Sequence, residues 1–266
     1  MLKSRIIPCL LISGGGLVKT IGFSNKIYLG DPINAVKIFS EKEVDELMVL
    51  DIDASTQEKE PNYKLIEYMA NECKMPLCYG GGIKTEAQAS RIINLGVEKI
   101  ALGAIAAQQP QIISSIAARV GTQSVVAVID AKKTSENRRE AHILNGKHNT
   151  GFSVLELALT FEKYGAGELV INDINNDGKM QGYDLALIDS IKQQISIPMT
   201  ILGGASSEEN ILEVIKRYNI IGVSAGSLFV FKGPLKAVLL NYPSKERKSY
   251  LVNTSSALTK ETSMHV

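Results

Sequence analysis

The sequence predicts an α/β protein, a (β/α)8 barrel built from two repeated half-barrels. Two observations predict this fold: the chain repeats itself at a fixed interval, and short apolar runs alternate with segments of helical period. In the repeat, Val44–Asp53 reads much like Ala166–Asn175, and Glu46 and Glu168 stand 122 positions apart. Each half is therefore one module of about 120 residues.

Eight apolar runs are the predicted strands, because near-continuous hydrophobicity is what a strand buried on both faces requires. They are Ile6–Leu11, Glu46–Asp51, Pro76–Tyr79, Lys99–Leu102, Ser124–Asp130, Glu168–Asn172, Met199–Leu202 and Gly222–Ala225. Helical patterns lie between them, for example Glu86–Leu95, Gln109–Arg119, Val154–Tyr164, Tyr183–Gln193 and Ser207–Tyr218. Eight strands, each followed by a helix, is the order of a (β/α)8 barrel. A doubly wound open sheet is the alternative, but it explains the fourfold alternation in each half less well.

Two connections between these elements are unusual. Residues 12–31 form a long, glycine-rich polar loop after the first strand, typical of a lid that closes over a barrel mouth. After the fifth strand, Asn145-Gly146 separates Glu140–Leu144 from Lys147–Thr150. An Asn-Gly pair between such runs is a strong signal for a β-hairpin.

Composition limits the classes of function. The 266 residues suffice for one large barrel domain, residues 1–243, followed by a polar tail, residues 244–266, which lacks periodicity. We expect this tail to be flexible or to cover a partner surface. Because 29 basic residues nearly balance 28 acidic ones, no charge field attracts nucleic acid or an anionic membrane. Cys9, Cys73 and Cys78 lack metal-ligand spacing, and no apolar stretch reaches the ~18 residues of a membrane span. A reduced, cytoplasmic protein without a metal site or cofactor is predicted.

Glycine turns follow the predicted strands in both halves. Phosphate groups bind to backbone N–H groups at helix N-termini, where glycine lets the chain approach closely. The first set is Gly81, Gly82, Gly103 and Ala104, and the second is Asp177, Gly178, Gly203, Gly204, Gly226 and Ser227. Tight turns need glycine in any case. Two matching sets at the repeat interval nevertheless favour two phosphate-binding sites over purely structural turns.

Ten segments carry a family resemblance that runs from residue 5 to about residue 240. They are Arg5–Leu10, Val18-Lys19, Gly30–Pro32, Leu50–Ile52, Gly80–Ile83, Ile129–Lys132, Gly165–Glu168, Asp177-Gly178, Gly182–Asp184 and Gly203–Ala205. Together they resemble the HisF-type cyclase subunit of imidazole glycerol phosphate synthase. The resemblance implies a lyase of histidine biosynthesis that forms a heterodimer with a HisH-like glutaminase subunit. Such a protein receives ammonia through the barrel and uses it to cleave and cyclise a bis-phosphorylated nucleotide.

The resemblance also implies a gate for ammonia at the bottom of the barrel, made of alternating charges. Arg5, Glu46, Lys99 and Glu168 fall at the positions of that gate. Ionised groups at a barrel bottom need partners, and a ring of two cations and two anions gives each one a partner. The same ring could instead be an ordinary salt-bridge plug that seals the barrel.

One catalytic position departs from the family pattern. The family uses two facing aspartates, at the ends of the first and fifth strands, as general acid and base. Asp130 matches the second, whereas Leu11 replaces the first. Leucine can neither take nor give a proton, so a mechanism that needs both carboxylates cannot run unchanged. Gly103 and Asn172 also replace the asparagine and threonine that the family typically has near its phosphates.

The run Cys9-Leu10-Leu11 is similar to that of the HisF-like paralogues found with bacterial surface-polysaccharide genes. Those proteins are thought to work with a glutaminase and a third, sugar-binding protein, and to introduce an amidino nitrogen into a nucleotide-linked sugar. The resemblance therefore allows a role in lipopolysaccharide biosynthesis. It also leaves open whether the ordinary cyclase activity is reduced or altered.

The leading hypothesis is an ammonia-using cyclase subunit of a glutamine amidotransferase. Asp130 would act as acid and base, and Lys19 on the mobile loop would neutralise developing charge. Asp51 and Asp177 are candidate supports, although Asp51 could equally anchor its own loop.

Two histidines and three rival functions complete the predictions. His142 and His148 lie on the predicted hairpin, and we expect both to face solvent. The rivals are the ordinary histidine-pathway enzyme, a non-catalytic barrel that binds a phosphorylated ligand and activates a glutaminase, and a single-chain aminoaldose isomerase. The isomerase has the same fold but expects an aspartate on the first strand and needs no ammonia gate.

Overall fold

The eight central strands form a closed parallel barrel in the computed structural model, which describes residues 3–134, 136 and 138–262. The barrel strands are β1 (Arg5–Ser13), β4 (Leu47–Asp51), β5 (Leu77–Gly80), β6 (Lys99–Leu102), β7 (Val125–Lys133), β10 (Glu168–Asp173), β11 (Met199–Leu202) and β12 (Gly222–Ala225). Each pairs with the next in chain order, and β12 pairs with β1 to close the barrel. The predicted barrel is confirmed, and the open-sheet alternative is wrong.

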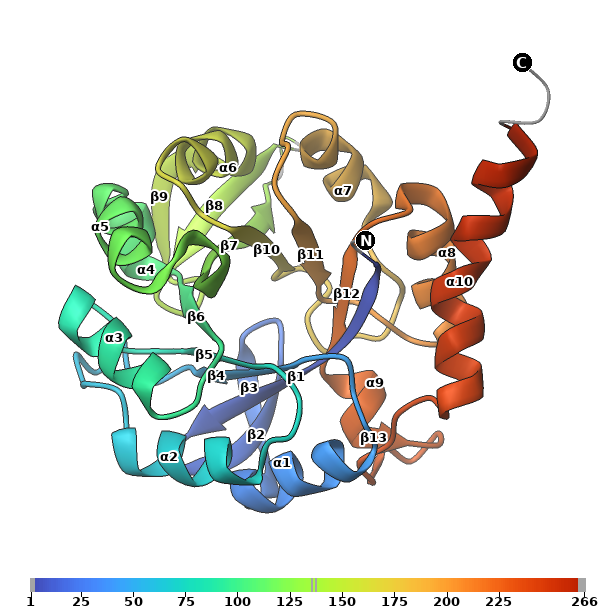
Figure 1. Cartoon of the computed structure of the whole chain (residues 1–266), viewed down its shortest axis with the longest axis horizontal. Coiled ribbons are helices and arrows are strands. Elements are labelled where there is room, and N and C mark those ends of the chain that lie inside the picture. Colours follow the sequence, from blue (N-terminus) through green and yellow to red (C-terminus); the bar gives the residue numbers. More distant parts are fainter. Residues whose placement is uncertain (1–2, 135, 137, 263–266) are drawn as a thin grey trace.

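Helices surround this barrel on its outside (Figure 1). They are α1 (Pro32–Glu41), α2 (Tyr63–Glu72), α3 (Glu86–Asn94), α4 (Ala104–Gln108), α5 (Gln111–Val120), α6 (Val154–Lys163), α7 (Leu185–Lys192) and α8 (Glu208–Tyr218), with a 3-10 turn at Thr122–Ser124. Local sequence explains where several of them begin. The Asp31 side chain accepts a hydrogen bond from the Asn34 N–H at the start of α1, and Ser153 and Glu156 form a capping box on α6.

Two β-hairpins extend the sheet beyond the barrel. Residues 12–31, predicted as a loop, instead continue β1 and form β2 (Gly16–Ile21) and β3 (Ser24–Gly30), which pair antiparallel. The loop prediction was wrong because β3 is mostly exposed and has only a short apolar run, Ile27–Leu29, which does not resemble a strand buried on both faces. The second hairpin, β8 (Arg139–Ile143) and β9 (His148–Ser153), turns at Asn145-Gly146 as predicted.

Two apolar clusters make up the core. The larger one fills the space between the strands and the surrounding helices. The smaller one fills the barrel interior and consists of Ile7, Cys9, Met48, Cys78, Ala101, Val126, Val170 and Leu202, with Leu11, Leu50 and Val128 packed against it. Because side chains alternate along a strand, the barrel strands supply one face to each cluster, except β12, whose apolar side chains belong only to the larger one.

The C-terminal segment corrects another prediction. After α9 (Ser227–Val230) and the short strands β13 (Phe231–Lys232) and β14 (Ala237–Val238), residues Lys245–Thr262 form helix α10 and not an irregular tail. Ser244 caps this helix, its hydroxyl accepting a hydrogen bond from the Arg247 N–H. Leu251 is fully buried, and α10 lies along α8 (Figure 1). The four last residues of the predicted tail lie outside the described residues. Within the described part of the chain, no helix is long and apolar enough to cross a membrane.

Candidate active site

A cavity lies at the carboxyl ends of the barrel strands. Counted together with the open space at its mouth, it measures about 1180 Å³. The predicted residues that line it are Lys19, Asp51, Gly81, Gly103, Ala104, Asp130, Asp177, Gly178, Gly203, Gly204, Gly226 and Ser227, and Gly82 lines an adjoining hollow. The barrel therefore brings together residues from both halves of the repeat.

Asp130 is the one carboxylate of strand β7 and lines the cavity. Burial raises its pKa to about 7, although the Asn172 amide donates a hydrogen bond to it over 3.0 Å and opposes the shift. Asn172 and Asp130 are register partners on the neighbouring strands β10 and β7. A carboxyl with a pKa near neutrality can both accept and return a proton at physiological pH. Leu11 lines the same cavity and supplies no such group.

Lys19 was expected on a mobile loop, but the structure places it in strand β2, where its side chain is buried. Its ammonium group lies 2.6 Å from an Asp177 carboxylate oxygen, and the Thr20 hydroxyl donates to the other oxygen over 2.7 Å. The Phe23 N–H donates to that second oxygen as well. The Asp177 carboxylate, predicted to belong to a phosphate site, therefore holds the β2–β3 hairpin in place.

Asp51 and its repeat mate Asp173 anchor their own loops in the same way. An Asp51 oxygen accepts hydrogen bonds from the N–H groups of Asp53 and Ala54. An Asp173 oxygen accepts one from the Asn175 N–H over 3.0 Å, the length of the bond from the Asp53 N–H to Asp51. This symmetry favours the anchoring interpretation of Asp51, and its catalytic role stays a prediction.

The two predicted glycine turns are also structurally equivalent. Gly81 and Gly203 adopt φ angles of 126° and 103°, in the region that favours glycine. A β-carbon would lie 2.6 Å from the Asp51 carbonyl oxygen at Gly81 and 2.7 Å from the Asp173 carbonyl oxygen at Gly203. Both turns thus need glycine, because the backbone lies too close to an aspartate at the end of the neighbouring strand to leave room for a β-carbon. The second site has a further feature: the Ser227 hydroxyl is buried and lacks a hydrogen-bond partner among the described residues.

His142 corrects the expectation that both hairpin histidines face solvent. His148 is exposed, but His142 is half-buried and lines the cavity together with Leu144 and Asn145. The Asn145 amide donates a hydrogen bond over 2.9 Å to the Ile52 carbonyl oxygen, which follows β4. The β8–β9 hairpin therefore leans over the mouth. Sequence reasoning missed this because the hairpin's direction depends on how β8 pairs with β7.

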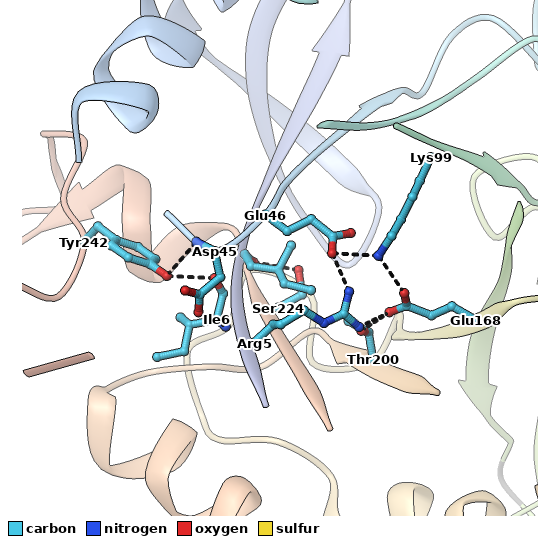
Figure 2. A network of polar contacts seen from close by, with 10 residues as sticks. Arg5, Ile6, Asp45, Glu46, Lys99, Glu168, Thr200, Ser224 and Tyr242 are labelled. Atoms are coloured by element: carbon cyan, nitrogen blue, oxygen red, sulfur yellow. Dashed lines mark hydrogen bonds and ion pairs between the residues drawn. The ribbon is translucent and has the colours of Figure 1, made fainter. Parts of the chain in front are cut away.

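The four predicted charges form a closed ring at the opposite end of the barrel. Arg5 contacts Glu46 and Glu168, the latter at 2.7 Å, and Lys99 lies 2.8 Å from Glu46 and 3.0 Å from Glu168. Figure 2 shows each cation between the two carboxylates, with Thr200 donating a further hydrogen bond to Glu168. The cations lower the pKa of Glu168 despite its burial.

The apolar interior cluster separates this ring from the cavity. Cys9, Leu11, Leu50, Ala101, Val128 and Leu202 belong to this interior group and also line the cavity. Burial raises the pKa of Cys9 to about 12 and that of Cys78 well above its usual value, so both thiols are neutral. In the described residues, no cluster of three or more His, Cys, Asp or Glu side chains could hold a metal ion.

Comparison with known proteins identifies the family. The family model described as histidine biosynthesis protein matches residues 5–235, nearly the whole barrel. The chain belongs to this family. A Leptospira interrogans protein, provisionally named imidazole glycerol phosphate synthase subunit HisF, is 55% identical over 252 residues, which is 94% of this chain and 99% of the relative.

Two further relatives agree with this HisF-like assignment. A Pseudomonas aeruginosa protein, provisionally named imidazole glycerol phosphate synthase subunit hisF2, is 46% identical over 91% of this chain and 97% of its own. The imidazole glycerol phosphate synthase subunit HisF of Streptococcus sanguinis is 34% identical over 86% of this chain and 91% of its own. The resemblance to HisF-type cyclases that the sequence motifs predict is confirmed.

Proposed function

We propose that this HisF-like chain is the cyclase subunit, a lyase, of a glutamine amidotransferase. It takes ammonia from a glutaminase partner and uses it on a substrate that carries two phosphate groups. One observation carries the proposal: a charged ring closes one end of the barrel, a cavity with two glycine turns opens at the other, and only apolar and neutral side chains separate them in the described structure.

The barrel interior suits neutral ammonia. A molecule without charge crosses an apolar passage at far lower cost than ammonium, which would need partners in the interior. The thiols of Cys9 and Cys78 are neutral and offer weak hydrogen bonds along the way. The ring of Arg5, Glu46, Lys99 and Glu168 is then the gate at the entrance. In this structure every cation of the ring contacts both carboxylates, so the ring is closed, as it would also be in a salt-bridge plug.

The cavity supports acid–base chemistry on an anionic substrate. Asp130 accepts and returns protons, because its pKa of about 7 lies near the working pH. Lys19, held by Asp177, supplies a buried positive charge beside the reacting groups. The two glycine turns receive the phosphates, and the unpartnered hydroxyl of Ser227 serves one of them.

Leu11 favours a function related to, but distinct from, the ordinary histidine-pathway reaction. With one facing carboxylate missing, that reaction would be slower or altered. We therefore propose that the chain serves amidino-sugar formation in surface-polysaccharide biosynthesis, with a third, sugar-binding amidotransferase protein. The second candidate is the ordinary synthase, which the retention of Asp130, Lys19 and the ring favours.

The decisive test uses the purified chain, ammonium chloride and the bis-phosphorylated ribonucleotide substrate of imidazole glycerol phosphate synthases. We expect formation of the imidazole product, more slowly than with an ordinary synthase, and its loss in Asp130→Asn. Turnover at the ordinary rate would assign the chain to histidine synthesis. If the wild-type chain and Asp130→Asn both bound the nucleotide tightly without turnover, the result would contradict the proposal and indicate a non-catalytic barrel.

A further inference from the structure

His142 stands next to Asp130 on the cavity side of the sheet. β7 and β8 are antiparallel, and their register pairs Asp130 with His142. Residues directly opposite each other in such a pair point to the same side, with β-carbons about 4.5–5.5 Å apart. The next pair, Ala131 with Ala141, is buried in the outer core cluster. Alternation therefore places Asp130 and His142 together on the inner side, where both line the cavity.

A hydrogen bond at the hairpin turn fixes the tautomer of His142. Its Nδ1 atom lies 3.1 Å from the carbonyl oxygen of Gly146. A carbonyl oxygen only accepts hydrogen bonds, so Nδ1 must carry the proton. In the neutral ring, Nε2 is then left with a free lone pair that can accept a proton.

Partial burial, together with two nearby basic side chains, lowers the pKa of His142 and favours its neutral ring. Burial lowers its pKa, as do Lys132 and His148, whereas the Gly146 hydrogen bond and Glu140 act in the opposite direction. Lys132 lies on β7, Glu140 on β8 and His148 on β9, so each of these three strands carries a group that shifts the pKa of His142. A neutral imidazole is the form that acts as a general base.

The opposite wall of the cavity lacks the group that would normally cooperate with Asp130. Leu11 lies there at the end of β1, and its side chain cannot transfer a proton. A substrate that must lose one proton and gain another needs two suitable groups, or one group that changes state between steps. Asp130 alone offers the second route, and Asp130 with His142 offers the first.

We propose that His142 is the second proton-transfer residue of this site and replaces, from β8, the carboxylate that is missing at position 11 of β1. This inference rests on the proposed function. Asp130 and His142 hold one shared proton. When His142 takes a proton from the substrate, protonated Asp130 gives one to it, which leaves His142 protonated and Asp130 ionised. Transfer of that proton from His142 to Asp130 then restores the starting state.

His142→Asn tests this directly, because the asparagine amide keeps a donor for the Gly146 carbonyl but cannot transfer protons. We expect kcat for ammonia-dependent turnover to fall by at least ~100-fold, with KM for the nucleotide nearly unchanged. The matched control is His148→Asn, which should keep wild-type activity. In the His142→Asn background, Leu11→Asp should restore most of the loss by supplying a carboxylate from the other wall. Wild-type activity in His142→Asn, or no rescue by Leu11→Asp, would overturn the inference.

A second measurement separates this inference from the proposed function. If the wild-type chain turns over no nucleotide, the proposed function fails, but the pairing of His142 with Asp130 is still measurable by NMR. Coupled groups titrate together. The His142 ring signals should therefore follow two steps in the wild type and one in Asp130→Asn, while His148 follows one step in both. A single, identical step for His142 in both proteins would refute the pairing.

Discussion

Replacing Glu46 by glutamine removes one charge from the ring and keeps the shape of the side chain. The Glu46 side chain is only 3% exposed and accepts from both Arg5 and Lys99. Removing one partner of a buried ion pair costs about 3–5 kcal/mol. Because Arg5 and Lys99 are 25% and 15% exposed and keep Glu168, the low end applies, about 3 kcal/mol. For a domain of this size that lowers Tm by roughly 6–12 °C.

Urea unfolding and a thermal scan measure this loss, and an exposed pair provides the matched control. Glu136 and Arg138 lie 2.9 Å apart with side chains 68% and 67% exposed. Glu136→Gln should therefore cost less than about 1 kcal/mol. The reasoning would be refuted if Glu46→Gln cost no more than Glu136→Gln.

A double variant tests whether the loss comes from charge imbalance. Glu46→Gln with Lys99→Met removes one charge of each sign and leaves the Arg5–Glu168 pair intact. The double variant should be more stable than the sum of the two single losses predicts, because each single variant leaves an unbalanced charge. Strictly additive losses would contradict this explanation.

Four further outcomes are expected. Burial raises the pKa of Asp130 to about 7 from 3.8, so the native state holds this proton more tightly and wild-type stability falls as pH rises between those values. Asp130→Asn should lack that slope in urea unfolding at a series of pH values, and an unchanged slope would contradict the assignment. Leu11→Asp should raise ammonia-dependent turnover of the nucleotide while costing about 1–3 kcal/mol of stability, because it places a carboxyl in a partly apolar wall. Gly103→Asn has no atom within 4 Å of its new β-carbon and should bind phosphorylated ligands more tightly in calorimetry without loss of Tm. Gly204→Ala would clash with the Gly182 carbonyl oxygen and should lower Tm.

The barrel could be predicted from the sequence because its strands are buried on both faces. Runs such as Lys99–Leu102, Met199–Leu202 and Gly222–Ala225 have the same bounds in the structure as in the prediction. A central strand needs apolar side chains toward both the interior and the helices, and that demand is visible in one sequence. The repeat then indicated which strands are equivalent.

The peripheral elements could not be predicted in this way. Strand β3 is mostly exposed, and its one apolar run, Ile27–Leu29, is too short and too closely flanked by polar residues and glycine to indicate a buried strand. Helix α10 is polar over most of its length, and a single residue such as Leu251 gives no helical period. Both elements are held by contacts with distant parts of the chain, as in the ion pair between Arg247 and Glu208.

The candidate site likewise contains residues that the sequence could place and residues whose position depends on the folded structure. Asp130, Lys19 and the glycine turns follow predicted strands or match family motifs, so the sequence placed them at the mouth. His142 depends on the register of β8 against β7, and a slip of one residue would have turned it to the other face. Likewise, Asp177 reads as part of a glycine turn, and only its contact with Lys19 shows that it holds the hairpin.

The proposed passage of ammonia along the barrel axis is tested most directly by following its nitrogen. The chain and the proposed glutaminase partner are given the nucleotide, glutamine with a heavy nitrogen isotope in its side-chain amide, and excess unlabelled ammonium in the solvent. If ammonia passes through the ring of Arg5, Glu46, Lys99 and Glu168, the product carries the heavy isotope almost undiluted. A product with the isotope ratio of the solvent would contradict the account, because the nitrogen would then have entered from outside the barrel.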